Sequence, residues 1–258
     1  KSIKKIFKNE KIFLLKDNPD LNKIDCAIIW NIPNNILKKL VNLKVIFSLG
    51  AGVDHILKLS NYKSTPIIRV KDSSMAERMS YHVLSQILEY QLNLKFFQKA
   101  QLRKLWQEGL QFQRQVKLNN QINVGILGVG FLGKHVGKFL QKLGYKVIGF
   151  KRTSPKEKFS FPIYTNKDLG GFIKSSNIIV SILPATIKTD NFIEKKFLKK
   201  MKDDSLLINV GRGASINELD LISHLSANKN FFVSLDVFKK EPLIKKSLLW
   251  NMNNVTIT

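Results

Sequence analysis

The sequence predicts an α/β protein made of two doubly wound lobes, each with a parallel sheet, joined by a long helix. Three observations lead to this prediction. Short β-branched apolar runs alternate with helical patterns over most of the 258 residues. These runs are continuously apolar, which is typical of parallel strands covered on both faces. A stretch without Gly or Pro, from Ser74 to Glu108, separates two such series.

Each series contains several candidate strands. In the first series the predicted strands are 11–15, 25–30, 44–49 and 66–70, with a helical pattern at 33–43. In the second series they are 122–127, 145–150, 177–183, 205–210, 231–236 and 255–258. We therefore expect a first domain over residues 1–92 and a second over residues 93–258.

The stretch between the two series predicts one long helix. Ser74 and Glu77 have the spacing of a capping box, in which each side chain satisfies a backbone N–H at the helix start. An apolar face continues through Met79, Val83, Ile87, Leu88, Phe96, Phe97 and Trp106. About 30 residues at ~1.5 Å per residue would reach ~45 Å, enough to bridge two domains or to contribute to a dimer interface. The polar stretch 108–121 is expected to be a connector.

Composition excludes several classes of protein. A single cysteine, Cys26, rules out a disulfide scaffold and a cysteine-based zinc cluster, and it fits a reducing compartment. No run of 18 apolar residues is present, and residues 1–10 lack the apolar core of a secretory signal. We expect a cytoplasmic protein without a metal or membrane partner. The chain begins without methionine and is expected to be a piece cut at both ends.

The formal net charge of +24 first suggests nucleic acid as a partner. However, only six of the 43 basic residues are arginine, and the lysines are dispersed along the chain. Dispersed lysine without arginine forks is typical of a solvated surface, so nucleic acid binding is not expected.

A glycine motif begins the second series. Strand 122–127 leads directly into Gly128, Gly130 and Gly133 in the spacing G-x-G-x-x-G, and a helical pattern follows. This context is typical of a dinucleotide site, where glycines permit a tight turn and close approach of a pyrophosphate to a helix N-terminus. A glycine turn without a ligand is the alternative.

The cofactor preference is predicted from the end of the next strand. NAD-binding lobes usually carry Asp or Glu there, but this chain has Lys151, Arg152 and Thr153. Because a cation attracts the 2′-phosphate that a carboxylate would repel, we expect NADPH to be preferred over NADH. A surface cation without a ligand is the alternative for Arg152.

Three further clusters complete a recognisable set: 48–55 at a strand end of the first lobe, 209–213, and 235–243. With the glycine motif and Leu183-Pro184, they resemble the D-isomer-specific 2-hydroxyacid dehydrogenases over nearly the whole chain. The resemblance implies a flavodoxin-like substrate domain, a Rossmann NAD(P)-binding domain and a homodimer. The cofactor-binding residues expected from the motifs and the resemblance are Gly128, Gly130, Phe131, Leu132, Gly133, Arg152, Thr153, Leu183, Pro184, Val210, Gly211 and Asp236.

The resemblance also implies substrate-binding residues. Arg212 corresponds to the catalytic arginine, whose planar fork suits the carboxylate and the carbonyl oxygen of a 2-oxo acid. Backbone N–H groups of Ala51 and Gly52 are expected to bind the substrate carboxylate. Trp30 is a candidate wall of the substrate pocket. The alternatives are a structural ion pair for Arg212, a plain turn at 50–53 and a core position for Trp30.

Two carboxylates have implied roles. Asp236 resembles the residue that orients the nicotinamide ring, although a helix cap is equally consistent with its position. Glu241 resembles the carboxylate that pairs with the catalytic histidine and raises its pKa; a solvated charge is the alternative.

The histidine of the family lies in a Pro-His pair directly after the strand that corresponds to 255–258. The histidines of this sequence are His55, His82, His135 and His224, and none has that position. We therefore expect the given chain to lack its proton donor; His55 lies near the substrate turn but is not expected to replace it.

The expected function is the NADPH-dependent reduction of small 2-oxo acids, such as glyoxylate and hydroxypyruvate, by hydride transfer. Two alternatives stay open: a reductase or dehydrogenase of a bulkier 2-hydroxy acid, and a non-catalytic NAD(P)-binding sensor.

Overall fold

The computed structural model describes residues 8–50, 52–106, 116–155 and 157–258. The chain divides into two compact units, Lys1–Lys71 and Asp72–Thr258. This division lies before the 92/93 position expected from the sequence. The reason is that the helix starting at Ser73 packs with the second sheet, as its buried Val83 and Ile87 lie in that unit's core.

The first unit has a parallel three-stranded sheet in the order β1-β2-β3. The elements are η1 (Leu15–Asp17), η2 (Leu21–Lys23), β1 (Cys26–Ile29), α2 (Asn34–Lys39), β2 (Val45–Ser48), α3 (Asp54–Leu57) and β3 (Ile67–Arg69). Its core contains Ile32, Leu37, Leu40, Ile46 and Ile56. Within the described residues the strand order follows the chain without reversal. The doubly wound arrangement predicted for this lobe is therefore not seen in these strands.

The predicted strand 11–15 is wrong. Phe13, Leu14 and Leu15 are each about half exposed, and the chain turns into η1 instead. Two reciprocal hydrogen bonds hold this turn: the N–H of Leu14 donates to the Asp17 carboxylate, and the N–H of Asp17 donates to the Leu14 carbonyl. An apolar run without a ladder partner thus has its backbone groups satisfied locally.

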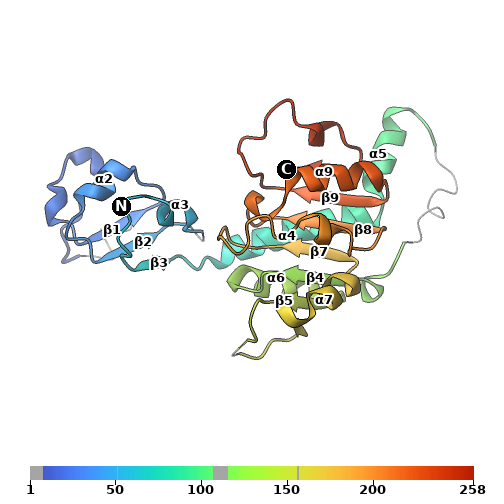
Figure 1. The fold of residues 1–258 in the computed structure, drawn as a ribbon, viewed down its shortest axis with the longest axis horizontal. Helices are drawn as coiled ribbons and strands as arrows, with labels where there is room; N and C mark the ends of the chain where they lie inside the picture. Colours follow the sequence, from blue (N-terminus) through green and yellow to red (C-terminus); the bar gives the residue numbers. More distant parts are fainter. Residues whose placement is uncertain (1–7, 51, 107–115, 156) are drawn as a thin grey trace. The chain divides into compact units, whose positions relative to one another are not determined.

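The second unit has a seven-stranded parallel sheet in the order β10-β9-β8-β7-β4-β5-β6 (Figure 1). The strands are β4 (Asn123–Leu127), β5 (Lys146–Phe150), β6 (Ile163–Tyr164), β7 (Ile178–Ser181), β8 (Ser205–Asn209), β9 (Phe231–Leu235) and β10 (Val255–Ile257). Six of the predicted strands are confirmed within a residue or two, and β6 was missed. The order reverses between β4 and β7, which makes this unit a doubly wound Rossmann sheet.

Helices cover both faces of this sheet. They are α4 (Ser73–Gln91), α5 (Leu94–Leu102), α6 (Phe131–Lys142), α7 (Leu169–Ser175), α8 (Lys195–Leu198) and α9 (Glu218–Ala227), with 3₁₀ turns η4 (Asn119–Gln121), η5 (Asn166–Asp168), η6 (Gly213–Ser215) and η7 (Leu248–Asn251). Alternate strand residues enter two separate cores. Ile178 and Val180 pack with α4 and α6, whereas Ile179 packs with α7, α8 and α9. This alternation explains why the strands are apolar throughout.

The single long helix predicted from Ser74 to Glu108 is wrong. α4 ends near Leu92, where Asn93 adopts a left-handed conformation with φ 55°, and α5 begins at Leu94. Asparagine tolerates this conformation better than most residues, so the break needs neither Gly nor Pro. The start also differs from the predicted capping box, because Asp72 is the N-cap and accepts from the N–H of Ser74. Residues 108–115 of the predicted connector lie outside the described residues.

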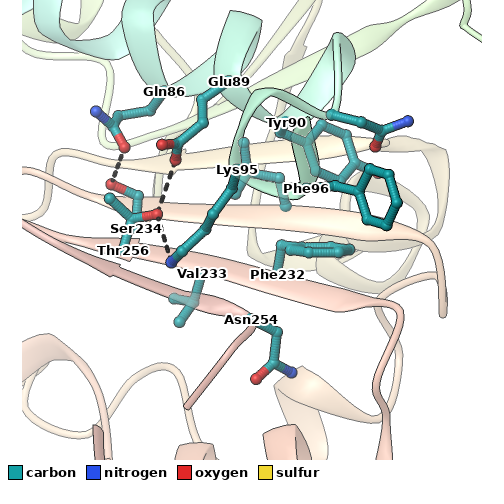
Figure 2. A pocket seen from close by; sticks show the side chains of 12 residues that line it. Gln86, Glu89, Tyr90, Lys95, Phe96, Phe232, Val233, Ser234, Asn254 and Thr256 are labelled. Carbon is teal, nitrogen blue, oxygen red and sulfur yellow. Dashed lines mark hydrogen bonds between the residues drawn. The ribbon is translucent and has the colours of Figure 1, made fainter. Parts of the chain in front are cut away.

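Polar side chains fasten α4 and α5 to the sheet (Figure 2). The Gln86 carbonyl oxygen accepts from Ser234 at 2.9 Å, and the Glu89 carboxylate accepts from Thr256 at 2.8 Å. Lys95 donates to the Val255 carbonyl and lies 3.3 Å from the Thr256 hydroxyl. Burial lowers the pKa of Lys95. The residues that make these bonds line a small cavity under the two helices, and none of the predicted site residues lines it.

The described part of the chain has neither a membrane-spanning helix nor a cluster of metal-ligating side chains. None of its helices combines the length and the hydrophobicity needed to cross a bilayer. No group of three or more His, Cys, Asp and Glu side chains in those residues is arranged to hold a metal ion.

The first turn of α6 offers a test of packing. Gly133→Ala should lower the free energy of unfolding by about 1–3 kcal/mol, because a Cβ there would lie 2.2 Å from the backbone oxygen of Gly128. Urea denaturation followed by circular dichroism measures the change. Gly170→Ala in α7 is the matched control, since its Cβ would have nothing within 4 Å. Equal midpoints for Gly133→Ala and the wild type would contradict the close packing.

Candidate active site

The candidate site begins where the order of the second sheet reverses. β4 and β7 are neighbours there, and the helices that follow them, α6 and α8, pack on opposite faces of the sheet; open α/β sheets bind ligands at such a position. Gly128 follows β4 with φ +103°, a conformation that favours glycine, and its N–H donates to the Phe150 carbonyl at 3.2 Å. A Cβ on Gly128 would lie 2.8 Å from the Ile182 oxygen that follows β7. The two strand ends thus meet through backbone.

The N-terminus of α6 has the features of an anion site. Gly130 is the N-cap, in an extended conformation, and as a glycine it has no side chain that could cap the helix. A Cβ on Gly130 would have no described atom within 4 Å, so the space beside this backbone is open. No acidic residue occupies the first turn, which starts with Phe131 and Leu132. The open N–H groups and the helix dipole fit the pyrophosphate of a dinucleotide.

The loop after β5 carries several charges. Arg152 and Thr153 are exposed directly beyond the strand end, while the N–H of Lys151 donates to the Tyr164 carbonyl at 3.0 Å. The loop also contains Glu157, whose carboxylate lies 2.5 Å from the ammonium of Lys134 on α6. That ion pair lowers the pKa of Glu157. Glu157 was not predicted as a site residue, because it lies several residues beyond the strand.

Two loops meet at the ends of β7 and β8. A Cβ on Gly211 would lie 2.7 Å from both the nitrogen and the oxygen of Leu183, so the two backbones are in contact. Val210 is buried and donates its N–H to the Ser181 carbonyl at 3.1 Å. The carbonyl of Pro184 accepts from the Thr189 hydroxyl at 2.5 Å. The structure therefore brings Leu183, Pro184, Val210 and Gly211 together.

Arg212 is half-buried and follows this contact. Its carbonyl accepts hydrogen bonds from the Asn209 amide at 3.2 Å and from the Ser215 hydroxyl at 2.7 Å. One guanidinium nitrogen, Nη1, donates to the Gly211 carbonyl at 2.9 Å. Since Asn209 also accepts from the N–H of Gly211, one buried amide positions the whole turn.

The loop after β9 packs directly on the Arg212 turn. A Cβ on Gly213 would lie only 1.8 Å from the carbonyl carbon of Phe238. The Glu241 carboxylate accepts from the N–H of Phe238 at 2.9 Å, and Glu218 on α9 accepts from the N–H of Lys239 at 2.8 Å. Glu241 is therefore a structured, exposed carboxylate on the loop that touches the Arg212 turn.

Asp236 lies at the end of β9. Its N–H donates to the Asn209 carbonyl at 3.1 Å, and its carboxylate accepts from the Thr258 hydroxyl at 3.0 Å. It therefore connects the ends of β9 and β10. The alternative of a helix cap is not supported, because a short loop rather than a described helix follows it.

The substrate turn predicted in the first unit is described in part. The buried Ser48 hydroxyl both donates to the Gly50 carbonyl and accepts from its N–H, at 3.2 Å. A Cβ on Gly50 would lie 3.5 Å from the Trp30 ring, which is 63% exposed. The core alternative for Trp30 is therefore wrong. Ala51 lies outside the described residues, and Gly52, which follows it, is half-buried.

The four histidines have different surroundings. His55 Nε2 lies 2.5 Å from the Trp30 carbonyl oxygen, so this ring nitrogen is already bound to backbone. His224 packs edge-on against Phe231, and burial lowers its pKa. His82 and His135 lie on α4 and α6, and Nε2 of His82 is buried without a hydrogen-bond partner among the described residues. Packing roles for His82, His135 and His224 agree with their predicted helical positions.

Sequence reasoning missed the residues that hold the site in place. Ser48, Asn209, Ser215 and Glu218 all bond to the backbone of a predicted site loop. A partial signal exists, because Ser48 and Asn209 are polar residues at the ends of apolar strands. Their partners become evident only from the folded loops.

Comparisons with known proteins agree with this geometry. Residues 84–258 match the family model described as the D-isomer specific 2-hydroxyacid dehydrogenase, NAD binding domain. The chain is 31% identical over 246 residues to glyoxylate/hydroxypyruvate reductase A of Yersinia enterocolitica, covering 93% of this chain and 77% of that protein. The protein of the same name from Citrobacter koseri is 31% identical over 245 residues, with the same coverage.

Solved structures are similar as well. The NADPH-dependent glyoxylate/hydroxypyruvate reductase of Sinorhizobium meliloti, in complex with NADP and sulfate, superposes with a TM-score of 0.86 at 30% identity, over 95% of this chain and 77% of that one. A probable 2-hydroxyacid dehydrogenase of Rhizobium etli, in complex with NADP, HEPES and L(+)-tartaric acid, gives 0.85 at 32% identity with the same coverage.

The fold, the glycine turn at the sheet reversal and these relatives point to one class of protein. The second unit is an NAD-binding Rossmann domain, and the activity is that of a nicotinamide-dependent oxidoreductase. The chain belongs to the family of D-isomer-specific 2-hydroxyacid dehydrogenases.

Proposed function

We propose that the protein reduces small 2-oxo acids, such as glyoxylate and hydroxypyruvate, to 2-hydroxy acids with NADPH. The observation that carries this proposal is the convergence of the Arg212 turn and the Glu241 loop at Gly213, on the edge of the sheet that holds the glycine turn. The names of the relatives from Yersinia enterocolitica and Sinorhizobium meliloti support the same substrates.

The second unit is proposed to hold the cofactor, which supplies a hydride to the keto carbon when bound. The open N-terminus of α6 at Gly130 would bind the pyrophosphate. Arg152, with Thr153, would bind the 2′-phosphate, because both are exposed beyond β5 and no carboxylate directly follows that strand. The NADP named with the Sinorhizobium meliloti structure supports this preference.

Arg212 is proposed as the catalytic residue that polarises the substrate carbonyl. Its guanidinium fork suits two oxygens of a 2-oxo acid, and its backbone is held by Asn209 and Ser215. In the first unit, the N–H groups of Ala51 and Gly52 are proposed to bind the substrate carboxylate, and the exposed Trp30 ring lies beside Gly50.

The two carboxylates have separate proposed roles. Asp236 would orient the nicotinamide ring from the end of β9, where Thr258 holds its side chain. Glu241 would pair with the proton-donating histidine of the family and keep it protonated near neutral pH. A cytoplasmic setting is inferred from the single, unpaired cysteine.

Steady-state NADPH oxidation tests the proposal. The full-length enzyme should turn over glyoxylate and hydroxypyruvate with a higher kcat/KM than a bulkier acid such as phenylpyruvate. A preference for phenylpyruvate would instead indicate a reductase of bulky 2-oxo acids. Tight NADPH binding without turnover of any 2-oxo acid would indicate a sensor.

Arg152→Ala should raise the KM for NADPH about tenfold to a hundredfold, because a charge-assisted bond to the 2′-phosphate is lost. The KM for NADH should change less than twofold. Initial rates with each cofactor at saturating glyoxylate measure both values. Lys146→Ala is the control, because it removes an exposed cation from the opposite end of β5. Equal losses for the two cofactors would contradict the role of Arg152.

Arg212→Lys should lower kcat/KM for glyoxylate about a hundredfold to a thousandfold, because an ammonium cannot bind two oxygens as a planar fork does. The dissociation constant of NADPH, measured by fluorescence titration, should change less than twofold. Lys245→Ala, an exposed position, is the control. Retention of wild-type kcat/KM by Arg212→Lys would exclude Arg212 as the polarising group.

A homodimer is also proposed, with α5 and residues 103–106 as its interface. Apolar side chains there are exposed: Leu94, Phe96, Phe97, Leu102, Leu105 and Trp106, of which Leu102 and Trp106 are 84% and 89% exposed. Exposed apolar residues grouped along one segment are typical of a protein interface.

Sedimentation velocity tests the dimer. The wild type should sediment as a dimer, and the double variant Leu102→Lys, Trp106→Lys should sediment as a monomer, because two buried charges oppose apolar contact. Leu219→Lys, at an 80% exposed position on α9, is the control. A monomeric wild type, or a double variant that stays dimeric, would contradict this interface.

A further inference from the structure

The ring of Phe159, in the loop that follows β5, lies close to the ammonium groups of two lysines. The ammonium of Lys134, in the first half of α6, lies 5.1 Å from the centre of the Phe159 ring. The ammonium of Lys151, directly after β5, lies 5.2 Å from the same centre. The two charges are therefore no further apart than the sum of these distances, although 17 positions separate them in the sequence. Arg152 is the neighbour of Lys151 in the chain.

The Phe159 ring is a fixed anchor. It packs against Phe161, with ring centres 5.9 Å apart, and Phe161 is only 4% exposed. Phe161 in turn fills the space beside Gly137 of α6 and Gly149 of β5, where a Cβ would lie 2.6 Å and 2.9 Å from its ring. Phe159 is thus attached to the core between α6 and β5, and the attraction of a cation for a ring face restrains both lysines.

Glu157 is the carboxylate of this cluster. The Lys134 ammonium donates a hydrogen bond to it at 2.5 Å, and this bond, with the charges of Lys134, Lys151 and Lys138, lowers the pKa of Glu157. Lys134 is 31% exposed and Glu157 is 54% exposed, so water screens the pair and its strength is modest. Any anion that approaches Lys134 must compete with this carboxylate.

We propose that Phe159 positions Lys134 and Lys151 to receive the 2′-phosphate of NADPH, and that Glu157 weakens this binding by pairing with Lys134. The inference rests on the proposed 2′-phosphate site at Arg152 and adds to it four residues that determine specificity. The chemical class of the ligand is a phosphate monoester on the adenosine ribose, which carries more negative charge than Glu157 and displaces it from Lys134.

Calorimetry with two fragments of the cofactor isolates this effect from catalysis. Adenosine 2′,5′-bisphosphate carries the 2′-phosphate, and 5′-AMP lacks it. Glu157→Gln should tighten binding of the bisphosphate about threefold, the scale of a surface ion pair. Phe159→Leu should weaken it about threefold, and Phe159→Tyr, which keeps a ring face, should restore it. Binding of 5′-AMP should stay within twofold in all three variants, which also shows that they are folded.

A double variant tests the link between Glu157 and Lys134. Lys134→Met should weaken binding of the bisphosphate, and adding Glu157→Gln to it should give no gain, because the two residues act as a pair. Lys142→Met, in the last turn of α6, is the matched control for loss of charge and should leave both fragments unaffected.

The outcomes separate this inference from the proposed function. If the wild type does not discriminate between the fragments and Arg152→Ala has no effect, the proposed 2′-phosphate site itself is wrong. If the wild type discriminates and Arg152→Ala abolishes the preference, but the Glu157 and Phe159 variants bind as the wild type does, only this inference is overturned. Equal changes for the bisphosphate and 5′-AMP would overturn it as well.

Discussion

Backbone segments approach one another at the carboxyl edge of the second sheet more closely than side chains would allow, and the site depends on this constraint. Gly133 packs on the Gly128 carbonyl, Gly211 on Leu183, and Gly213 on the carbonyl of Phe238. Gly133 and Gly128 both follow β4, whereas the other two contacts join segments that follow different strands: β8 and β7 for Gly211, and β8 and β9 for Gly213. Because no side chain separates these segments, the turns that carry the predicted phosphate-binding residues, the proposed catalytic arginine and the Glu241 carboxylate all lie at one edge of the sheet.

Polar residues complete what the glycines permit. Asn209 binds both the N–H of Gly211 and the carbonyl of Arg212, and its own carbonyl accepts from Asp236. One buried amide at the end of β8 thus connects the turn of the proposed catalytic arginine with the end of β9. A buried polar side chain in such a position has to be fully bonded, and this requirement makes the loops rigid.

Charge acts locally in this protein, although its total of +24 is large. Most lysines lie on the surface, where an isolated charge has little effect on folding. Lys134 and Lys151 differ because a ring and a carboxylate restrain them beside the β5 loop. The structure of an apolar run also depends on its surroundings. The run 11–15 has no sheet partner among the described residues and forms a turn, whereas similar runs in the second unit are buried between two layers of helices.

Local patterns and residues adjacent in the chain are enough to predict the α/β class, six strands of the second sheet, the glycine turn and the family. The break of the predicted long helix at Asn93, the packing of α4 with the second sheet, and the contact between Glu157 and Lys134 become known only from the folded chain. Helical periodicity does not reveal a single left-handed residue, and the pairing of charges 23 positions apart depends on how β5 and α6 pack.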